Sequence, residues 1–189
     1  MDAFSYISVI ISVVIGLGLS QLLTGAAELV KARRRVSFYW VHLLWVALTF
    51  VAHIFLWWTM WNLRLVRDWN FFSFLRLLLA PVLLYVAAAF LIPKVEPGVS
   101  IDLREYFYEN HAAFFSVTAA FTALLGIENW MLRGRLSPAP VTVVFAVWFV
   151  LLCVSAVVKN ARYHAAIGLL FGLLFLLFIV LFGLRLGAT

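Results

Sequence analysis

The chain has 189 residues, of which 66% are hydrophobic and only 12% are charged, whereas soluble domains average about 45–50% and 25%. With a mean hydropathy of +1.09, the chain has too little polar surface to cover a water-soluble globule. The net charge of +6 does not indicate nucleic acid, because the basic residues lie in short loops beside apolar runs. We therefore expect an all-α integral membrane protein whose main partner is the lipid bilayer.

The apolar segments predict a bundle of six transmembrane helices. A helix that crosses a bilayer needs roughly 20 apolar residues, and the chain holds six such runs separated by charged or proline-containing breaks. No segment is left for a soluble domain, so residues 1–189 form a single membrane domain. The spans are expected at about 4–30, 38–62, 70–93, 111–132, 140–158 and 163–186, with an interfacial connector at 94–110.

The connector at 94–110 is acidic and amphipathic. Asp102, followed three residues later by Glu105, resembles a helix-capping pair, which predicts a short interfacial helix that runs into the fourth span. The segment is interpreted either as a plain amphipathic connector or as an acidic vestibule or docking site on the cytoplasmic side.

The distribution of Lys and Arg predicts the orientation, because positively charged loops resist translocation. Eight of these residues fall on one side of the six spans and five on the other, so both termini are expected outside the inner (cytoplasmic) membrane of a bacterium. The inner set is Lys31, Arg33, Arg34, Arg35, Lys94, Arg104, Lys159 and Arg162, and the outer set is Arg64, Arg67, Arg133, Arg135 and Arg185.

Small residues recur every four positions in the first span, at Ser12, Gly16 and Ser20, and Gly168 and Gly172 repeat this spacing in the sixth. Small residues allow helix backbones to approach closely in lipid. They predict helix packing, either inside the bundle or across a homodimer or higher homo-oligomer. The alternative for the first span is a polar pathway that includes Gln21.

The second and fourth spans each carry a polar stripe. Thr49 and His53 lie 7 and 11 residues after His42, which is within ~20° of the same helix face. Such stripes must face protein or water, because unpaired polar groups in hydrocarbon are costly. They are interpreted as structural hydrogen-bonding groups or as the lining of a pathway; the fourth span contributes His111, Thr118, Thr122 and Asn129.

Counting residues from the span ends places His53, Arg76, Glu128 and Asn129 at a similar depth, in the outer third of the membrane. A charged side chain there is expected to be paired or functional. Arg76 and Glu128 are the obvious ion pair, and His53 would be the titratable group beside them. The helical phase opposes a single cluster, because Glu128 lies ~100° from the stripe of Asn129. The alternative is a structural or interfacial role.

Four side chains near the inner surface, Glu28, His42, His111 and His164, are weak candidates for a Zn²⁺ site, since no local spacing motif joins them. Haem is a weaker possibility, because His53 has no second histidine at its own depth. Cys153 has no cysteine partner. No resident cofactor is therefore expected.

No nucleophile, phosphate-loop or metalloprotease motif occurs, so an enzyme is not expected. The leading hypothesis is a proton- or ion-conducting or coupled transport subunit that uses the intramembrane His, Arg and Glu group. The alternative is an accessory or scaffolding membrane subunit without transport activity. A haem- or metal-binding membrane protein is the third hypothesis.

Overall fold

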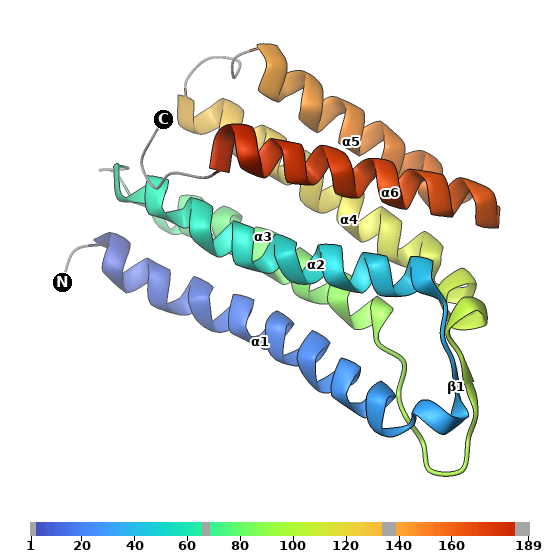
Figure 1. The fold of residues 1–189 in the computed structure, drawn as a ribbon. Helices are drawn as coiled ribbons and strands as arrows, with labels where there is room; N and C mark the ends of the chain where they lie inside the picture. The colour runs from blue at the N-terminus through green and yellow to red at the C-terminus, as the bar shows by residue number, and fades with distance from the viewer. Residues whose placement is uncertain (1–2, 66–68, 134–138, 184–189) are drawn as a thin grey trace.

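The computed structural model describes residues 3–65, 69–133 and 139–183. Within these ranges the chain is a bundle of long helices that lie side by side (Figure 1). Residues 184–186 of the expected sixth span, and Arg67, Arg135 and Arg185 of the charge count, lie outside the described residues. The long helices are α1 (Ala3–Lys31), α2 (Trp40–Thr59), α3 (Phe71–Leu91), α4 (Leu103–Arg133), α5 (Ala139–Val157) and α6 (Ala161–Phe178).

Within the described ranges, five of these helices are long and apolar enough to cross a membrane: α1, α2, α3, α4 and α6. The fold is therefore that of a multi-pass membrane protein, as the composition predicts. The described part of α5 is apolar but shorter, over Val141–Val157. Figure 1 shows α5 running beside α4 and α6 along the bundle.

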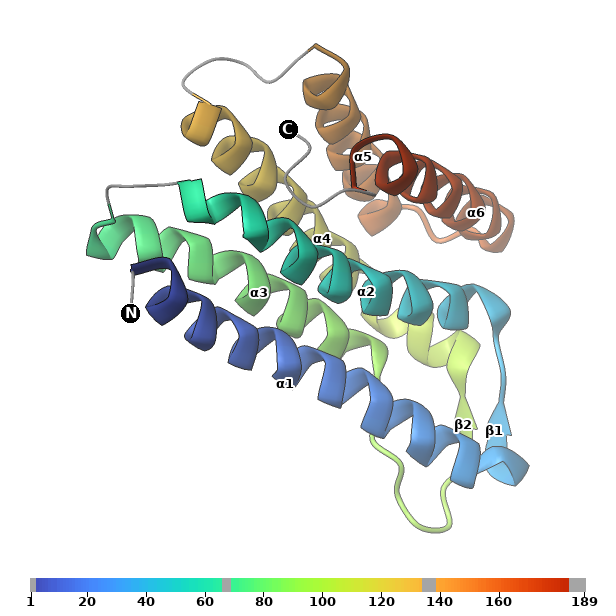
Figure 2. The ribbon, with the colours of Figure 1, turned by 60° about the vertical axis from the view of Figure 1, so that its left-hand side comes forward.

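The helices pack in an order that differs from the chain order (Figure 2). α3 lies between α1 and α4, and α4 packs on its other side against α5, while α2 contacts α1, α3 and α6. The largest buried cluster is aromatic. Trp45 of α2 makes edge contacts with Phe114 and Phe115 of α4 and a tilted contact with Phe171 of α6. Aromatic packing thus joins three helices at the centre of the bundle.

One end of the bundle is closed by a short parallel strand pair that the sequence did not predict. After the 3₁₀ turn η1 (Arg33–Arg35), strand β1 (Val36–Ser37) pairs with β2 (Ile101–Asp102). The Arg35 guanidinium donates hydrogen bonds of 3.1 and 3.2 Å to the carbonyl oxygens of Glu96 and Val99. These contacts tie the α1–α2 connection to the α3–α4 connection.

Helix α4 begins at Leu103, so the expected connector at 94–110 is helical in its second half and the span that follows is longer than 111–132. The Asp102 carboxylate accepts hydrogen bonds from the backbone N–H groups of Arg104 and Glu105. It satisfies donors that the first helical turn leaves free. The expected helix-capping role of Asp102 is therefore confirmed, and the interfacial helix is continuous with α4.

Asparagine side chains fix the starts of two other helices. Asn70 accepts a hydrogen bond from Ser73 N at the start of α3, and Asn160 accepts from Arg162 N and Tyr163 N at the start of α6. The other ends are less regular: α2 continues as the 3₁₀ segment η2 (Met60–Leu65), and α6 continues as a π-helical segment η3 (Ile179–Gly183). Apart from α4, which begins eight residues earlier than the expected fourth span, the starts of the long helices lie within about two residues of those expected.

Candidate functional site

The central feature of the site is an ion pair between α3 and α4. Arg76, the sixth residue of α3, donates from Nε to Oε1 of Glu128, which lies six residues from the end of α4. Glu128 is only 5% exposed, whereas the Arg76 side chain is 29% exposed. The second carboxylate oxygen of Glu128, Oε2, is buried and has no hydrogen-bond partner among the described residues. The expected pairing of these two side chains is present in the structure.

Apolar side chains lie one helical turn from the pair. Ala80 on α3 forms a buried cluster with Leu84 and Phe121, and the half-buried Leu124 and Leu125 on α4 pack against this cluster. Because residues three and four apart share a helix face, this cluster adjoins the ion pair on the side of the bundle interior. Attraction between the two charges is stronger in such surroundings than in water. The unpartnered Oε2 atom is correspondingly costly.

His53 is fully buried at the α1–α2 interface and does not join the ion pair by any hydrogen bond within the described ranges. Its Nδ1 donates to the carbonyl oxygen of Thr49, 2.8 Å away. Its Nε2 faces α1 at Gly18: a Cβ placed on residue 18 would lie 2.1 Å from that nitrogen. The absence of a side chain at Gly18 is what makes room for the imidazole.

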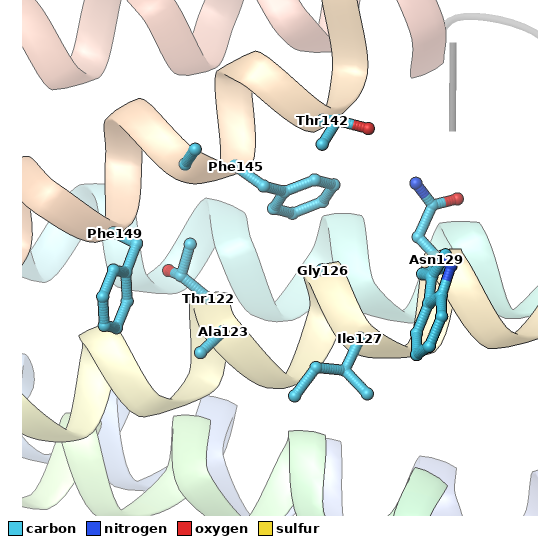
Figure 3. Close-up of a pocket in the computed structure, with 10 residues that line it drawn as sticks. Thr122, Ala123, Gly126, Ile127, Asn129, Thr142, Phe145 and Phe149 are labelled. Atoms are coloured by element: carbon cyan, nitrogen blue, oxygen red, sulfur yellow. The ribbon is translucent and has the colours of Figure 1, made fainter. Parts of the chain in front are cut away.

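Asn129 faces a different neighbouring helix from Glu128. It lines a cavity of about 320 Å³ between α4 and α5, and Figure 3 shows the Asn129 amide at one end of it. Glu128 faces α3, so the two neighbours are separated as their helical phase predicts. The cavity is mostly apolar, and its lining is Thr122, Ala123, Gly126, Ile127, Asn129, Trp130, Thr142, Phe145, Ala146 and Phe149.

The threonines of the α4 stripe use their hydroxyl protons within their own helix. Thr118 Oγ1 donates to Phe114 O at 2.8 Å, and Thr122 Oγ1 donates to Thr118 O at 2.9 Å. Their oxygens can still accept a hydrogen bond. On the other expected lining positions, Thr49 is buried in α2 and Gln21 is half-buried in α1. The side chains of the two stripes thus lie at different interfaces of the bundle.

The expected packing residues divide into two sets. In α6, Gly168 lies beside Leu44 and Trp45 of α2, and Gly172 lies beside Leu48. In α1, Gly16 and Ser20 are exposed and Ser12 is half-buried, and a Cβ on Gly16 would meet nothing within 4 Å. Close packing of α1 inside the bundle instead uses Gly18, against His53, and Gly25, against Ile92.

The four weak candidates for a metal site, Glu28, His42, His111 and His164, are not assembled into one group. Over the described ranges, no three or more His, Cys, Asp or Glu side chains lie close enough together to hold an ion. Glu28 is exposed, and the ring contacts of His42 are with Tyr106 and Phe107. The four weak candidates therefore do not form a common metal site among the described residues. The rings of His111 and His164 do meet, with centroids 5.7 Å apart.

These histidines also stabilise helix ends. His42 Nε2 donates to the carbonyl oxygen of Leu91 at the end of α3, and His164 Nε2 donates to that of Val158 just after α5, both over 2.7 Å. Carbonyl groups at helix C-termini have no partner inside the helix. Sequence reasoning missed this role, because the bonds join residues 49 and 6 positions apart.

No protein family, curated protein or solved structure matches the chain. The class of the protein therefore rests on its own helices, which make it a multi-pass membrane protein. Among the described residues, the side chains that distinguish it are the partly buried ion pair of Arg76 with Glu128 and a set of buried histidines.

Proposed function

We propose that the protein is a proton- or ion-conducting or coupled transport subunit of the bacterial inner membrane. The observation that carries the proposal is the Arg76–Glu128 ion pair, which lies inside two candidate spans with Glu128 Oε2 buried and without a partner among the described residues. Ionisable residues within membrane spans are costly and typically mark ion pathways or proton relays.

In this proposal Glu128 is the group that exchanges a proton or a cation. At rest, the Arg76 guanidinium is held by electrostatic attraction to Oε1 of Glu128. Binding of a proton at Oε2 weakens that attraction and frees the guanidinium. Arg76 then acts as an electrostatic gate, which favours anions or excludes cations while it is unpaired.

Helix α5 is the sixth span in this proposal. A 19-residue helix is about 28 Å long, which is close to the roughly 30 Å of a hydrocarbon core. The mostly apolar cavity between α4 and α5 is the entrance in this proposal, with Asn129 and Thr122 as polar groups on its wall. His53 is a second proton-binding group, which water reaches only when α1 moves away from α2.

In this proposal the protein works as a homodimer or higher homo-oligomer. The exposed positions Gly16 and Ser20 of α1 provide a surface on which a second α1 could pack closely. Both termini lie outside the cell membrane in this arrangement, which follows from the Lys and Arg count.

The test is flux in proteoliposomes that contain the purified protein. We expect pH-dependent proton or ion flux in the wild type and its loss in both Glu128→Gln and His53→Ala. Glu109→Gln is the matched control, because Glu109 lies on the same helix but is exposed near its start. It should leave the flux unchanged. Wild-type vesicles no leakier than empty ones would overturn the proposal.

One observation favours an accessory or scaffolding subunit as the second candidate. Each buried histidine and each threonine of the α4 stripe already donates a hydrogen bond to a backbone carbonyl. Polar groups engaged in this way can serve helix packing alone. An inactive wild type that is folded in vesicles would favour this second function.

A further inference from the structure

Three buried histidines lie near the end of the bundle where α2, α4 and α6 begin. His42 and His164 are 0% exposed and His111 is 2% exposed. Each donates one ring N–H to a backbone carbonyl, that of Leu91, Val158 or Tyr108. A carbonyl oxygen only accepts, so the donating nitrogen carries the proton and the other nitrogen of a neutral ring offers a lone pair.

The lone-pair nitrogens are His42 Nδ1, His111 Nε2 and His164 Nδ1. All three are buried, and none has a hydrogen-bond partner within the described part of the chain. Histidines that bind metals characteristically donate their other ring N–H to a carbonyl or carboxylate, which fixes the tautomer and the ring orientation. The carbonyl contacts therefore hold each neutral ring in one tautomer and leave its other nitrogen free to bind a metal ion.

Two of the rings are close enough to share a ligand. The centroids of His111 and His164 are 5.7 Å apart, with an angle of 84° between the ring planes. An ion about 2 Å from each of two imidazole nitrogens joins rings whose centroids lie about 6 Å apart. The observed separation of the two ring centres is within the range that one shared ion requires.

Aromatic rings surround the pair. Phe115 stacks on His164 at 5.3 Å, Phe107 meets the same ring edge to face at 5.3 Å, and Tyr108 lies 5.7 Å from it. The faces of aromatic rings attract cations, and they do so more strongly where water is excluded. The surroundings thus suit a cation of low charge.

We propose that His111 and His164 bind one soft monovalent metal ion, of the Cu(I) and Ag(I) class. The described residues offer these imidazoles no carboxylate or thiolate as a third ligand, whereas Zn²⁺ sites normally take four ligands. Imidazole is a good ligand for copper, and Cu(I) and Ag(I) are stable with two ligands in a near-linear arrangement. A single charge also costs less to bury than a double one. This site is independent of the Arg76–Glu128 pair.

The test uses Ag(I), which does not change oxidation state, on purified protein in detergent after removal of any affinity tag. The background carries Cys153→Ala, because an exposed thiol would bind silver itself. We expect about one Ag(I) per chain by elemental analysis after desalting. Both His111→Leu and His164→Leu should lose this ion. His53→Leu is the matched control, because His53 is equally buried but faces Gly18.

Circular dichroism of each variant shows whether it is folded, and X-ray absorption of Cu(I)-loaded protein supplies a second readout. The expected spectrum has two nitrogen ligands at about 2 Å. Folded wild type that retains no Ag(I), or equal Ag(I) content in wild type and both histidine variants, would overturn the site. The first of these outcomes would indicate that a water molecule bridges the two lone pairs.

Discussion

Glu128 is the most deeply buried Asp, Glu, Lys or Arg residue that the structure describes. One of its carboxylate oxygens is paired with Arg76 and the other is buried without a partner. Removing one member of a buried ion pair is more costly than removing both, because it leaves a charge in poor surroundings. This asymmetry gives a test that does not depend on transport.

We expect Arg76→Ala and Glu128→Ala each to lower the free energy of unfolding by about 2 kcal/mol, less than a fully buried pair would lose because Arg76 is partly exposed. The double variant should lose less than the sum of the two. Thermal unfolding in detergent, followed by circular dichroism, measures the double-mutant cycle. Arg104→Ala is the control, because the Arg104 side chain is exposed. A coupling energy near zero would show that the pair is energetically unimportant.

Gly18 sets the position of His53, and a matched glycine on the same helix lets this contact be tested. Gly18→Ala should lower the free energy of unfolding by about 1–3 kcal/mol, because the new methyl group overlaps the imidazole. Gly16→Ala should be neutral or stabilising, since its Cβ enters open space and alanine favours helix. The melting temperatures of both variants provide the measurement.

The double variant Gly18→Ala/His53→Ala should recover stability relative to Gly18→Ala, because the imidazole that clashes is gone. Equal melting temperatures for Gly18→Ala and Gly16→Ala would mean that α1 can shift without cost. His53 would then be less tightly enclosed than its contacts indicate.

At the scale of the helices, the sequence predicts positions along a helix axis better than directions around it. Counting residues from the span ends placed Arg76 and Glu128 at one depth, and they meet. The same count placed His53 beside them, yet its ring faces α1. The direction of a side chain depends on which helix packs on which face, and the order in which α1, α3, α4 and α5 pack is a tertiary property.

Local hydrogen bonding explains where the expected helix boundaries succeed or fail. Asp102 was recognisable as a cap because its partners, Arg104 and Glu105, are its near neighbours. The pairing of Val36 with Ile101 was not recognisable, because two-residue strands carry no periodicity and the partners are 65 positions apart. The role of Arg35 depends on that pairing and was missed for the same reason.

Arg35 should hold the segment between α3 and β2 in place. We expect Arg35→Ala to lose about 1 kcal/mol of local stability, which is roughly fivefold more opening of that segment. Trypsin cleavage after exposed Lys94 measures this opening directly. Arg34→Ala is the matched control, since Arg34 is exposed and adjacent. Equal cleavage rates in both variants would show that the strand pair alone holds the segment.

At the scale of the whole molecule, composition was sufficient to predict a helical multi-pass membrane protein, and the long apolar helices agree with it. The number of crossings depends on whether α5 spans the membrane. Their direction is predicted from the positions of Lys and Arg alone. Cysteine labelling in right-side-out vesicles with an impermeant maleimide addresses both, on a Cys153→Ala background.

We expect Arg64→Cys, in the η2 segment that follows α2, to react from outside. Ser100→Cys and Lys159→Cys should react only after permeabilisation. All three positions are exposed in the structure. Because Lys159 follows α5, its labelling from outside together with Arg64 would mean that α5 does not cross the membrane. Labelling of Ser100 and Lys159 from outside, without labelling of Arg64, would reverse the expected orientation.

The strand pair at one end of the bundle determines how the first four helices can move. Because β1 and β2 bind the α1–α2 and α3–α4 connections together, the helix ends nearest them are fixed. The Arg76–Glu128 pair lies near the opposite ends of α3 and α4. We therefore expect any separation of the helices to be smallest beside the strand pair and largest at the opposite end of the bundle, where the two charged side chains lie.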